Sequence, residues 1–460
     1  MMKEFAILTL GCKVNQYESQ QVRQWLERHG LTQVDIAASP DVVVVNTCCV
    51  THTASAKSRH LIAQAQRHHP DAIIVCGCLP AVDTDELEIA GENVHVVKDR
   101  TDLTTTLNLL AGVKSTTPES ETPRHPRDTR IKADFDLKVK PKQDLDSSVE
   151  LAPLTCFPGR TRAFLKIQDG CDSFCSYCII PLARPRVHSR GAAEILAEAE
   201  ALIAAGHKEI VITGVHIGAY GHASVRRRDA NSENAHLPAL LADLAQVPGL
   251  ARIRLSSLDP ADVTTDLLDV CAANRNIMPH LHLSLQSGSD AVLRRMGRPY
   301  TADEFRAKVE LIRSRLDRPA LTTDIIVGFP GETDADFEQT FALARDVGFA
   351  KTHVFAFSPR KGTAAARMAD KVPSQVAKER SRTLRALDQQ LQIRFRAQFL
   401  GETAQVLIET TDPAASGRAE RYFPVHVASN GPLKPDKNDL VTVTLIENTP
   451  TGVLGELVTQ

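Results

Sequence analysis

The first part of the chain alternates short apolar stretches with longer ones in which apolar and polar residues follow a helical period. The apolar stretches are rich in Val and Ile, and we expect strands at 6–10, 42–46, 72–75 and 94–97. The amphipathic stretches predict helices at 15–30, 53–69, 83–90 and 102–112. Strands of continuous Val and Ile between helices are typical of a parallel sheet covered on both faces. The pattern therefore predicts a doubly wound parallel α/β domain over residues 1–113.

The apolar pattern breaks off between residues 114 and 158. Residues 114–130 are rich in Pro, Ser, Thr and charged side chains, and residues 138–150 contain few apolar ones. A segment of this composition buries too little apolar surface to fold alone. We expect a linker here and a domain boundary at it.

Strands and helices resume after the linker with a longer period. Six strands are expected at 163–168, 209–213, 252–257, 280–286, 321–329 and 352–358, with helices between them, such as 192–206, 302–316 and 335–348. Six strand–helix units fit an open, partial TIM barrel over residues 159–395, in which active groups lie at the C-terminal ends of the strands. An open doubly wound sheet is the competing architecture for the same pattern.

The end of the chain has the pattern of a small all-β unit. A long helix is expected at 376–401, followed by short strands at 403–410, 422–428, 440–446 and 453–458. The turn-forming runs at 412–413 and 430–432 separate them. The pattern predicts a β-barrel over residues 396–460, of a size that often binds RNA. The expected fold class is α/β in three domains, which suits a chain of 460 residues.

Composition changes this picture little. No apolar run approaches the roughly 20 residues needed to cross a bilayer, and the N-terminus lacks the regions of a secretory signal peptide. We therefore expect a cytoplasmic protein with no membrane partner. The 54 basic and 56 acidic residues nearly cancel, so binding of nucleic acid would need a local basic face. Residues 226–228 and the basic positions of the helix at 376–401 are candidates, with a solvated surface as the alternative for each.

Ten cysteines are many for a cytoplasmic chain, where clustered cysteines more often bind metal than form disulfides. The strongest pattern is C-x3-C-x2-C at Cys171, Cys175 and Cys178, directly after an expected strand. Three thiolates on one loop can hold three corners of a cubane iron–sulfur cluster and leave one iron open to a ligand. Zinc is the alternative, although structural zinc sites usually take four ligands.

A second set of cysteines is dispersed along the first domain. Cys12, Cys48 and Cys78 each stand just past an expected parallel strand. The carboxyl ends of neighbouring strands meet at one sheet edge, so these three thiols can converge there. The alternative for each is a small buried core residue. The remaining cysteines are expected to be core or inert thiols: Cys49, Cys76, Cys156 and Cys271.

The cysteine loop at 171–178 resembles the radical S-adenosyl-L-methionine (SAM) signature, with Phe174 and Tyr177 as its hydrophobic and aromatic fillers. Both cysteine sets together resemble the methylthiotransferase family over nearly the whole chain. The β tail is similar to the TRAM domain of that family, which contacts RNA. The segments that carry the resemblance are 9–19, 46–51, 77–80, 212–221, 255–260, 281–301, 324–333 and 355–365.

The resemblance implies an enzyme with two [4Fe-4S] clusters and SAM as cofactors. Cys171, Cys175 and Cys178 would hold the catalytic cluster, which cleaves SAM to a radical that activates the substrate carbon. The dispersed cysteine set would hold a second cluster that holds or donates the sulfur, and another SAM would supply the methyl group. The implied partners are tRNA, at its anticodon stem-loop, and an electron donor such as flavodoxin or ferredoxin. The resemblance names no sulfur donor.

Further positions in the matching segments are candidate contacts of SAM. Glycines at strand ends allow close approach of an adenosyl group, Ser and Gln side chains can hydrogen-bond its ribose or methionine atoms, and an arginine can meet a carboxylate. Turns, strand ends and a surface ion pair are the alternatives. Asp324 and Glu332 are candidates for positioning ligand or substrate, with a helix cap as the alternative for Glu332. The SAM candidates are Gly214, Ser256, Ser284, Gln286, Ser287, Gly288 and Arg298.

Branches of the family act on N6-threonylcarbamoyladenosine in tRNA, on N6-isopentenyladenosine in tRNA, or on a ribosomal protein aspartate. Segments 214–221, 256–260 and 357–365 resemble the first branch, whereas the second carries Gln-Asn-Val-Asn at the first of these places. We therefore expect a methylthio group to be added to C2 of N6-threonylcarbamoyladenosine next to the anticodon. Pro185 departs from the glycine usual in the family and touches no cluster ligand. Rivals from other classes are a non-catalytic iron–sulfur electron carrier and a zinc-dependent RNA-binding protein.

Overall fold

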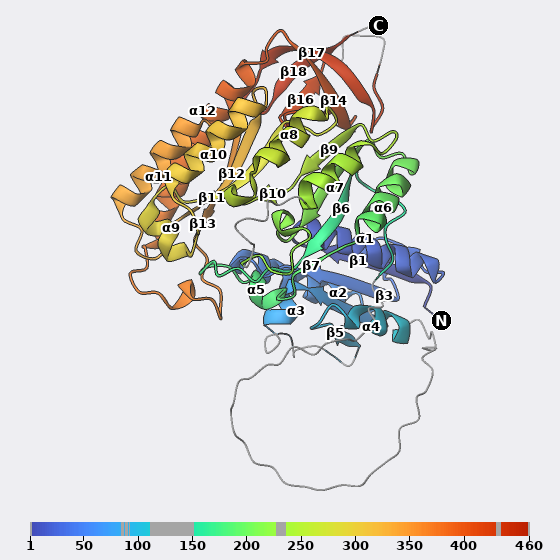
Figure 1. The fold of residues 1–460 in the computed structure, drawn as a ribbon. Coiled ribbons are helices and arrows are strands. Elements are labelled where there is room, and N and C mark those ends of the chain that lie inside the picture. The colour runs from blue at the N-terminus through green and yellow to red at the C-terminus, as the bar shows by residue number, and fades with distance from the viewer. Residues whose placement is uncertain are drawn as a thin grey trace.

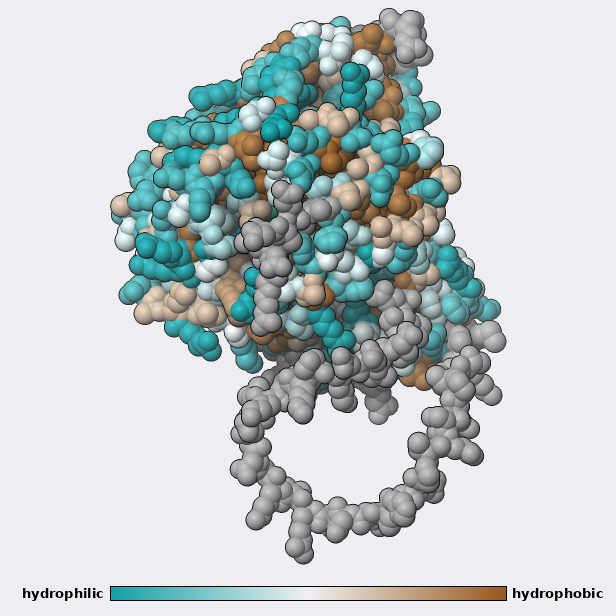
Figure 2. All heavy atoms as spheres, viewed as in Figure 1, coloured by the Kyte–Doolittle hydropathy of each residue, from teal (hydrophilic) through white to brown (hydrophobic). Residues whose placement is uncertain are grey.

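The computed structural model describes residues 2–83, 87, 91, 93–110, 151–226, 236–428 and 434–458. Three units follow one another along the chain, and the N-terminal and C-terminal units lie at opposite ends of the central one (Figure 1). Polar side chains cover most of the face seen in Figure 2, where apolar side chains form small separate groups. Among the described residues, no helix is both long and apolar enough to span a membrane.

The N-terminal sheet has five parallel strands in the order β2-β1-β3-β4-β5. Residues 42–45 of β3 are all buried, because a parallel strand covered on both faces needs apolar residues at successive positions. The predicted doubly wound domain is confirmed. Its elements are β1 (Glu4–Thr9), α1 (Lys13–Arg28), β2 (Thr32–Gln33), β3 (Val42–Thr47), α2 (His52–Arg67), β4 (Ala72–Gly77), α3 (Cys78–Val82), β5 (Val94–Val96) and α4 (Asp102–Leu110).

The helix that follows β4 differs from the prediction. A short helix, α3, begins at Cys78 directly after the strand, whereas the apolar periodicity placed a helix at 83–90. Residues 84–86 and 88–90 of that prediction lie outside the described residues. Pro80 occupies the first turn of α3, where a missing backbone N–H costs nothing.

Residues 151–157 lie along α1. The side-chain amides of Gln21 and Gln24 donate to the carbonyl oxygens of Leu151 and Pro153, at 2.9 and 2.8 Å. The Phe157 side chain is fully buried in the core of the central domain. The end of the predicted linker segment therefore packs against both the first and the second domain, while residues 111–150 lie outside the described residues.

The central domain is an open barrel made of two four-stranded sheets, β7-β6-β8-β9 and β10-β11-β12-β13. The chain passes from one sheet to the other at Ser256, and a bridge between Ile253 and Ile277 links them. The helices lie outside the strands (Figure 1). The predicted six-unit partial TIM barrel is confirmed, and the competing doubly wound sheet is wrong. The short strand β7, antiparallel to β6, was not predicted.

The strands of this barrel are β6 (Arg162–Asp169), β7 (His188–Ser189), β8 (Glu209–Gly214), β9 (Arg252–Leu255), β10 (Ser257–Leu258), β11 (His280–Gln286), β12 (Ala320–Val327) and β13 (Lys351–Ala356). Its helices are α5 (Ile180–Ala183), α6 (Ala192–Ala204), α7 (His236–Ala245), α8 (Thr265–Ala273), α9 (Asp290–Met296), α10 (Ala302–Arg315), α11 (Asp334–Val347) and α12 (Ser374–Ala397).

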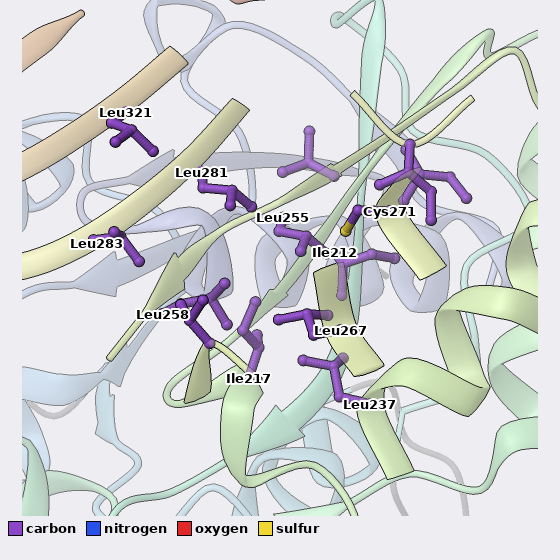
Figure 3. Packing of buried hydrophobic residues seen from close by; sticks show 14 of the residues in the cluster. Ile212, Ile217, Leu237, Leu255, Leu258, Leu267, Cys271, Leu281, Leu283 and Leu321 are labelled. Atoms are coloured by element: carbon purple, nitrogen blue, oxygen red, sulfur yellow. The ribbon is translucent and has the colours of Figure 1, made fainter. Parts of the chain in front are cut away.

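The core of the central domain lies between strands and outer helices. Figure 3 shows Ile212, Leu255 and Leu281 of the strands packed with Leu267 and Cys271 of α8. Burying one such aliphatic side chain stabilises the fold by about 1.5–3 kcal/mol. Cys271 is therefore a packing residue of this apolar core, and it is far in sequence from the other cysteines.

The C-terminal unit is a closed barrel with the strand order β14-β15-β16-β18-β17. The four predicted strands correspond to β14, β16, β17 and β18. Strand β15 was not predicted, because its four residues hold no apolar run. The strands are β14 (Thr403–Thr410), β15 (Ser416–Ala419), β16 (Pro424–Val427), β17 (Leu440–Asn448) and β18 (Val453–Leu457).

Two buried arginines join the central barrel to the C-terminal barrel. Arg252 donates to the carbonyl oxygens of Gln405 and Arg418, at 2.6 and 3.0 Å. Arg254 donates through Nε to Glu209 at 2.7 Å, and its other nitrogens reach carbonyls of the C-terminal barrel. Burial alone would raise the pKa of Glu209, but the guanidinium of Arg254 outweighs it and holds that pKa below its ordinary value. The junction is therefore a paired, buried ionic contact.

Candidate active site

Three thiols meet at the carboxyl edge of the N-terminal sheet. Strands β1, β3 and β4 are neighbours, and Cys12, Cys48 and Cys78 follow their ends. The register pairs Thr47 with Gly77, so Cys48 and Cys78 leave the sheet side by side. Burial raises the pKa of Cys78, Arg184 lowers it, and the neighbouring Cys12 and Cys48 thiols raise it further.

The turn after β1 brings Cys12 towards the other two. Gly11 has φ +129°, and a Cβ at this position would lie 3.2 Å from Cβ of Cys48 and 2.7 Å from Nδ2 of Asn15. Only glycine adopts this conformation without strain. The Asn15 side-chain amide donates to the carbonyl oxygen of Thr47 at 2.8 Å and so ties the turn to the end of β3. The convergence is built into the residues around each cysteine.

The neighbouring cysteines have other partners. The Cys49 thiol donates to the carbonyl oxygen of Cys78 at 3.3 Å. Cys76 lies in β4 within the apolar core, and burial raises its pKa to about 12. Burial also raises the pKa of Cys48. Thiols in such surroundings ionise when a metal ion takes the place of the proton.

The second set of thiols lies on the loop between β6 and α5. Gly170, with φ +77°, turns the backbone so closely against Arg186 that a Cβ would overlap the Arg186 carbonyl. The backbone N–H of Ser176 donates to the Met296 carbonyl at 2.8 Å, and its hydroxyl donates to the Arg295 carbonyl at 2.7 Å. The loop is therefore anchored to the C-terminal end of α9.

The three thiols of this loop lie close together. The Ser173 N–H donates to Sγ of Cys171 at 3.4 Å, and the Ser173 hydroxyl lies 3.5 Å from Sγ of Cys175. Burial raises the pKa of Cys178 to about 12, with the neighbouring charges of Cys175 and Cys171 acting in the same direction. The loop therefore presents three sulfur atoms as one group of possible metal ligands.

The two aromatic residues of the loop differ in their surroundings. Tyr177 packs against the apolar cluster that contains Met296 and Phe329. Phe174 is 66% exposed, and the guanidinium carbon of Arg226 lies 3.2 Å from the centre of its ring. Only Tyr177 therefore acts as a filler of the interior.

Arg298 is the candidate SAM contact that lies beside this loop. It donates to Sγ of Cys175 at 3.2 Å and to the hydroxyl of Tyr300 at 3.1 Å, and it also pairs with Asp259. The Tyr300 hydroxyl in turn donates to the Ser284 carbonyl at 2.6 Å. The side chain of Arg298 is 5% exposed. A buried cation held in this way stabilises negative charge on the adjacent sulfur.

His216 brings a second positive charge to the loop. Its Nε2 lies 3.1 Å from Oδ2 of Asp262, and its backbone N–H donates to Oε1 of Gln168 at 2.7 Å. Burial would lower the pKa of His216, but the Asp262 carboxylate outweighs it, and with a hydrogen bond to Cys171 the pKa rises to about 10. A Cβ at Gly218 would overlap the Asp262 carboxylate, so glycine is required there.

One arginine connects the two thiol sets. Nε of Arg184 donates to Sγ of Cys78 at 3.4 Å. Its Nη1 donates to both oxygens of Asp169 at 2.9 Å and to Oε1 of Glu18 at 2.8 Å. Asp169 ends β6 just before the cysteine loop, Glu18 lies on α1, and Lys166 joins the network 2.9 Å from Asp169. The guanidinium therefore holds the edge of the N-terminal sheet against the rim of the barrel.

Four other SAM candidates lie towards the C-terminal ends of barrel strands. Gly214 is the last residue of β8, and Ser256 follows β9. Ser284 and Gln286 lie at the C-terminal end of β11. Gln286 has φ +67°, a conformation that costs a residue other than glycine about 1–3 kcal/mol. Strand β11 ends at this residue.

The last two candidates pack against α11. The Ser287 hydroxyl lies 3.2 Å from the hydroxyl of Thr340, and a Cβ at Gly288 would lie 2.6 Å from Cα of Thr340. Glu332 lies elsewhere, bonded to Arg380 and to the Gly328 N–H. The requirement for glycine at 288 is thus explained by contact with a helix.

A cavity of about 630 Å³ lies between the barrel strands and the C-terminal barrel. This volume is within the range of small-molecule sites. Asp324 lies in its wall between His282 and His353, with ligand atoms of all three within 4.8 Å of one another. Oδ2 of Asp324 is 3.3 Å from Nε2 of His282. Lys13, from the N-terminal domain, also lines this cavity.

The residues present suit iron–sulfur clusters at both thiol sets. All ten cysteines are free of disulfides. Each set offers three thiols, and Cys49, which follows Cys48 in the chain, is bonded to a carbonyl. Three thiolates leave one iron of a cubane open, whereas a structural zinc ion would lack its fourth ligand.

Sequence reasoning did not find Arg184, His216, Asp262 or Lys13 as parts of the site. Arg184 acts through partners more than 100 residues away in sequence, Glu18 and Cys78, which no local pattern shows. His216 and Lys13 had a signal, since each stands in a segment that carries the family resemblance.

Comparison with known proteins supports both halves of this site. The radical SAM superfamily matches residues 165–344. A second family, described as uncharacterized protein family UPF0004, matches residues 4–98. The two matches contain the cysteine loop and the dispersed cysteine set, respectively.

Curated relatives cover nearly the whole chain. The threonylcarbamoyladenosine tRNA methylthiotransferase MtaB of Chlamydia pneumoniae is 36% identical over 457 residues, which is 99% of this chain and 98% of the relative. The protein of the same name from Thermotoga maritima is 37% identical, covering 89% and 87%. The tRNA-2-methylthio-N(6)-dimethylallyladenosine synthase of Novosphingobium aromaticivorans is 32% identical, covering 99% and 97%.

Solved structures agree at the level of the fold. The radical SAM methyltransferase TsrM of Kitasatospora setae, in complex with tryptophan and a SAM analogue, superposes with a TM-score of 0.52 at 14% identity. The match covers 77% of this chain and 73% of that one.

Proposed function

Because the chain belongs to the tRNA methylthiotransferase family of radical SAM enzymes, we propose that it adds a methylthio group to C2 of N6-threonylcarbamoyladenosine next to the anticodon of tRNA. The observation that carries the proposal is the meeting of two three-thiol sets through Arg184. Sulfur insertion needs a site that activates the carbon and a site that supplies sulfur, and the two must lie together. The relatives of 36–37% identity carry the name of this activity.

The loop with Cys171, Cys175 and Cys178 would hold a [4Fe-4S] cluster, as the family requires an iron–sulfur cluster and SAM. When bound, this pair supplies a carbon radical by reductive cleavage of the SAM sulfonium. The chain contributes position and charge. Arg298 donates to the Cys175 sulfur, and the charged His216 lies beside Cys171. Both cations stabilise the negative charge of thiolate ligands in a site of low dielectric.

Cys12, Cys48 and Cys78 would hold the second [4Fe-4S] cluster, which supplies the sulfur when bound. Two of these thiols are buried, at 5% and 3% exposure, and Cys12 is exposed. The exposed Cys12 leaves this set of thiols accessible from solvent. Arg184 donates to the Cys78 sulfur and so fixes its orientation towards the barrel rim.

The proposed partner is tRNA, and the small C-terminal barrel is the proposed contact for it, because closed five-stranded β-barrels commonly bind nucleic acid. Clusters of this kind need a one-electron donor of the flavodoxin or ferredoxin class. The cytoplasm is the proposed location, because the proposed substrate is a tRNA.

The test is a reconstitution. Purified protein with iron and sulfide restored is incubated with SAM, a reductant and tRNA that carries N6-threonylcarbamoyladenosine, and the digested nucleosides are analysed by mass spectrometry. The methylthio derivative of that nucleoside is the expected product. Methylthiolation of tRNA with N6-isopentenyladenosine alone would assign the chain to the other tRNA branch. Cleavage of SAM with no product on either tRNA would overturn the proposal.

A further inference from the structure

The cavity in the barrel has an unbalanced charge. Seven lysine and arginine side chains line it, against one carboxylate, Asp324, among the described residues. Most of these cations are already engaged. Five form ion pairs with carboxylates: Arg162, Arg254, Lys351, Arg418 and Arg421. Arg396 donates to Asn448 and to the Thr449 carbonyl. These six residues serve to join the elements around the cavity.

Lys13 is the exception. It forms neither a hydrogen bond nor an ion pair within the described part of the chain, although it is half-buried at the cavity wall. Its charge acts on His280, another residue of the cavity wall. Burial lowers the pKa of His280 well below its ordinary value, and Lys13 is among the cations that lower it further. An ammonium group left without a counter-charge in a partly enclosed space favours an anionic ligand.

The position of Lys13 connects the cavity to the chemistry. It is the first residue of α1 and follows Cys12 directly. In an adenine ring, C2 and C6 flank the same nitrogen, N1. A base whose C2 faces the edge that carries Cys12 therefore brings the substituent on N6 close to the next residue of the chain.

The histidines and Asp324 of the cavity complete a polar wall. His282 and Asp324 face each other at 3.3 Å, and Nδ1 of His282 lies 2.9 Å from the Thr322 hydroxyl. Burial lowers the pKa of His353, so this side chain is a neutral donor near pH 7. Two imidazoles and a carboxylate are also able to hold a divalent cation. The uncompensated Lys13 favours an anion in this space instead.

We propose that Lys13 forms the binding site for the carboxylate of the threonylcarbamoyl group, with His282, His353 and Asp324 as hydrogen-bonding partners of its hydroxyl and carbamoyl groups. This inference rests on the proposed function and names the group by which the enzyme selects its nucleoside. An isopentenyl group carries no charge, so it leaves both Lys13 and the polar wall without partners. Unpaired buried polar groups penalise the wrong substrate.

The experiment measures affinity rather than turnover. Anticodon stem-loop RNAs are made with N6-threonylcarbamoyladenosine, with its methylamide in place of the carboxylate, and with N6-isopentenyladenosine. Dissociation constants are measured for the cluster-loaded wild type and for Lys13→Gln, Lys13→Arg and Lys57→Gln. Lys57 is an exposed lysine of α2 and controls for the loss of one charge in the same domain. The ratio of the acid and amide affinities is independent of the fraction of active protein.

The wild type and Lys57→Gln should bind the acid more tightly than the amide by roughly 10- to 100-fold, as expected for a charge-assisted hydrogen bond. Lys13→Gln should bring the ratio close to one, and Lys13→Arg should keep most of it. Equal affinities of the wild type for acid and amide would overturn the proposal, and this result does not depend on the folding of any variant. Retention of the ratio in Lys13→Gln would overturn it as well.

Two further outcomes separate this inference from the proposed function and from a metal site. Methylthio product on the threonylcarbamoyl RNA with equal affinities would leave the function standing and remove the site. Tighter binding of the acid that depends on Lys13, with no methylthio product, would leave the site standing and remove the proposed function. A stoichiometric divalent metal beyond the cluster iron, lost in His353→Gln, would assign the polar wall to a cation and overturn the role given to it here.

Discussion

Nε of Arg184 lies 3.4 Å from Sγ of Cys78. The same guanidinium is bonded to Asp169 on β6 and to Glu18 on α1, and its side chain is 10% exposed. One buried cation thus holds a sulfur of the N-terminal domain at a fixed place relative to the loop that begins two residues after Asp169. Two domains that could otherwise hinge are held in register at the point where their chemistry must meet.

Replacing Arg184 should therefore destabilise the junction. In Arg184→Gln, the buried Glu18 and the partly buried Asp169 each lose one ion-pair partner and keep Lys166. We expect the free energy of unfolding to fall by about 1–3 kcal/mol. The matched control is Arg186→Gln, whose side chain is 77% exposed and 3.6 Å from Asp99, where a change of about 0–1 kcal/mol is expected. Chemical denaturation of both variants measures the difference, and equal effects would contradict the buried role.

The cysteine loop is tested by the variant with Cys171, Cys175 and Cys178 replaced by Ala. It should produce no 5′-deoxyadenosine from SAM, because no thiolates remain to hold the cluster there. It should keep roughly half its iron, since the other set of cysteines is unchanged. Cys156→Ala is the control, because Cys156 lies outside both sets and contacts Arg23. Continued SAM cleavage by the triple variant would exclude the radical role of the loop.

For the dispersed cysteines we expect the opposite effect on SAM cleavage. With Cys12, Cys48 and Cys78 replaced by Ala, the protein should still cleave SAM but form no methylthio nucleoside. Its iron and sulfide should also fall to roughly half. Iron, 5′-deoxyadenosine and methylthio nucleoside are measured on one preparation. If the three residues were packing cysteines only, sulfur insertion would persist in whatever fraction remains folded.

Local patterns were enough to predict the parallel strands, the six-unit barrel and the meeting of Cys12, Cys48 and Cys78. Each of these follows from apolar periodicity and from the rule that parallel strands end at one edge. They did not reveal the neighbour of Gly288, a SAM candidate whose Cβ position lies 2.6 Å from Cα of Thr340 in α11. A glycine requirement has the same appearance in sequence whether the close neighbour is a ligand or a helix.

Gly218 gives a prediction about the charged group beside the loop. A Cβ there would overlap the Asp262 carboxylate, so Gly218→Ala should break the contact between Asp262 and His216. We expect a loss of about 1–3 kcal/mol in stability and weaker SAM cleavage. Gly191→Ala is the control, since φ is −65° and nothing lies within 4 Å of its Cβ position. Its effect should be within about 0.5 kcal/mol, and a similar loss in both would refute the steric argument.

The junction of the two barrels should depend on pH through Glu209. Its pKa lies below the ordinary value of 4.5 because of Arg254, so the stability it contributes is present above pH 4.5 and is lost as pH falls below that value. Glu209→Gln should lower the free energy that stabilises the junction of the two barrels by about 3–5 kcal/mol at neutral pH. The substitution leaves Arg252 and Arg254 buried without a counter-charge.

Limited proteolysis of the junction measures this effect against pH. The control is Glu447→Gln, which removes an exposed carboxylate of β17 and should leave the cleavage rate unchanged. A junction in Glu209→Gln that resists protease as well as the wild type at neutral pH would show that the buried carboxylate is dispensable.

The two thiol sets also differ in the stage of folding at which each can assemble. One stands within a single loop, from 171 to 178, while the other is spread from 12 to 78 and is assembled only by the pairing of β1, β3 and β4. A short loop gathers its ligands at little entropic cost, whereas a set brought together by long-range strand pairing has to wait for the sheet. The cluster proposed for the first domain should therefore be inserted only once that domain has folded.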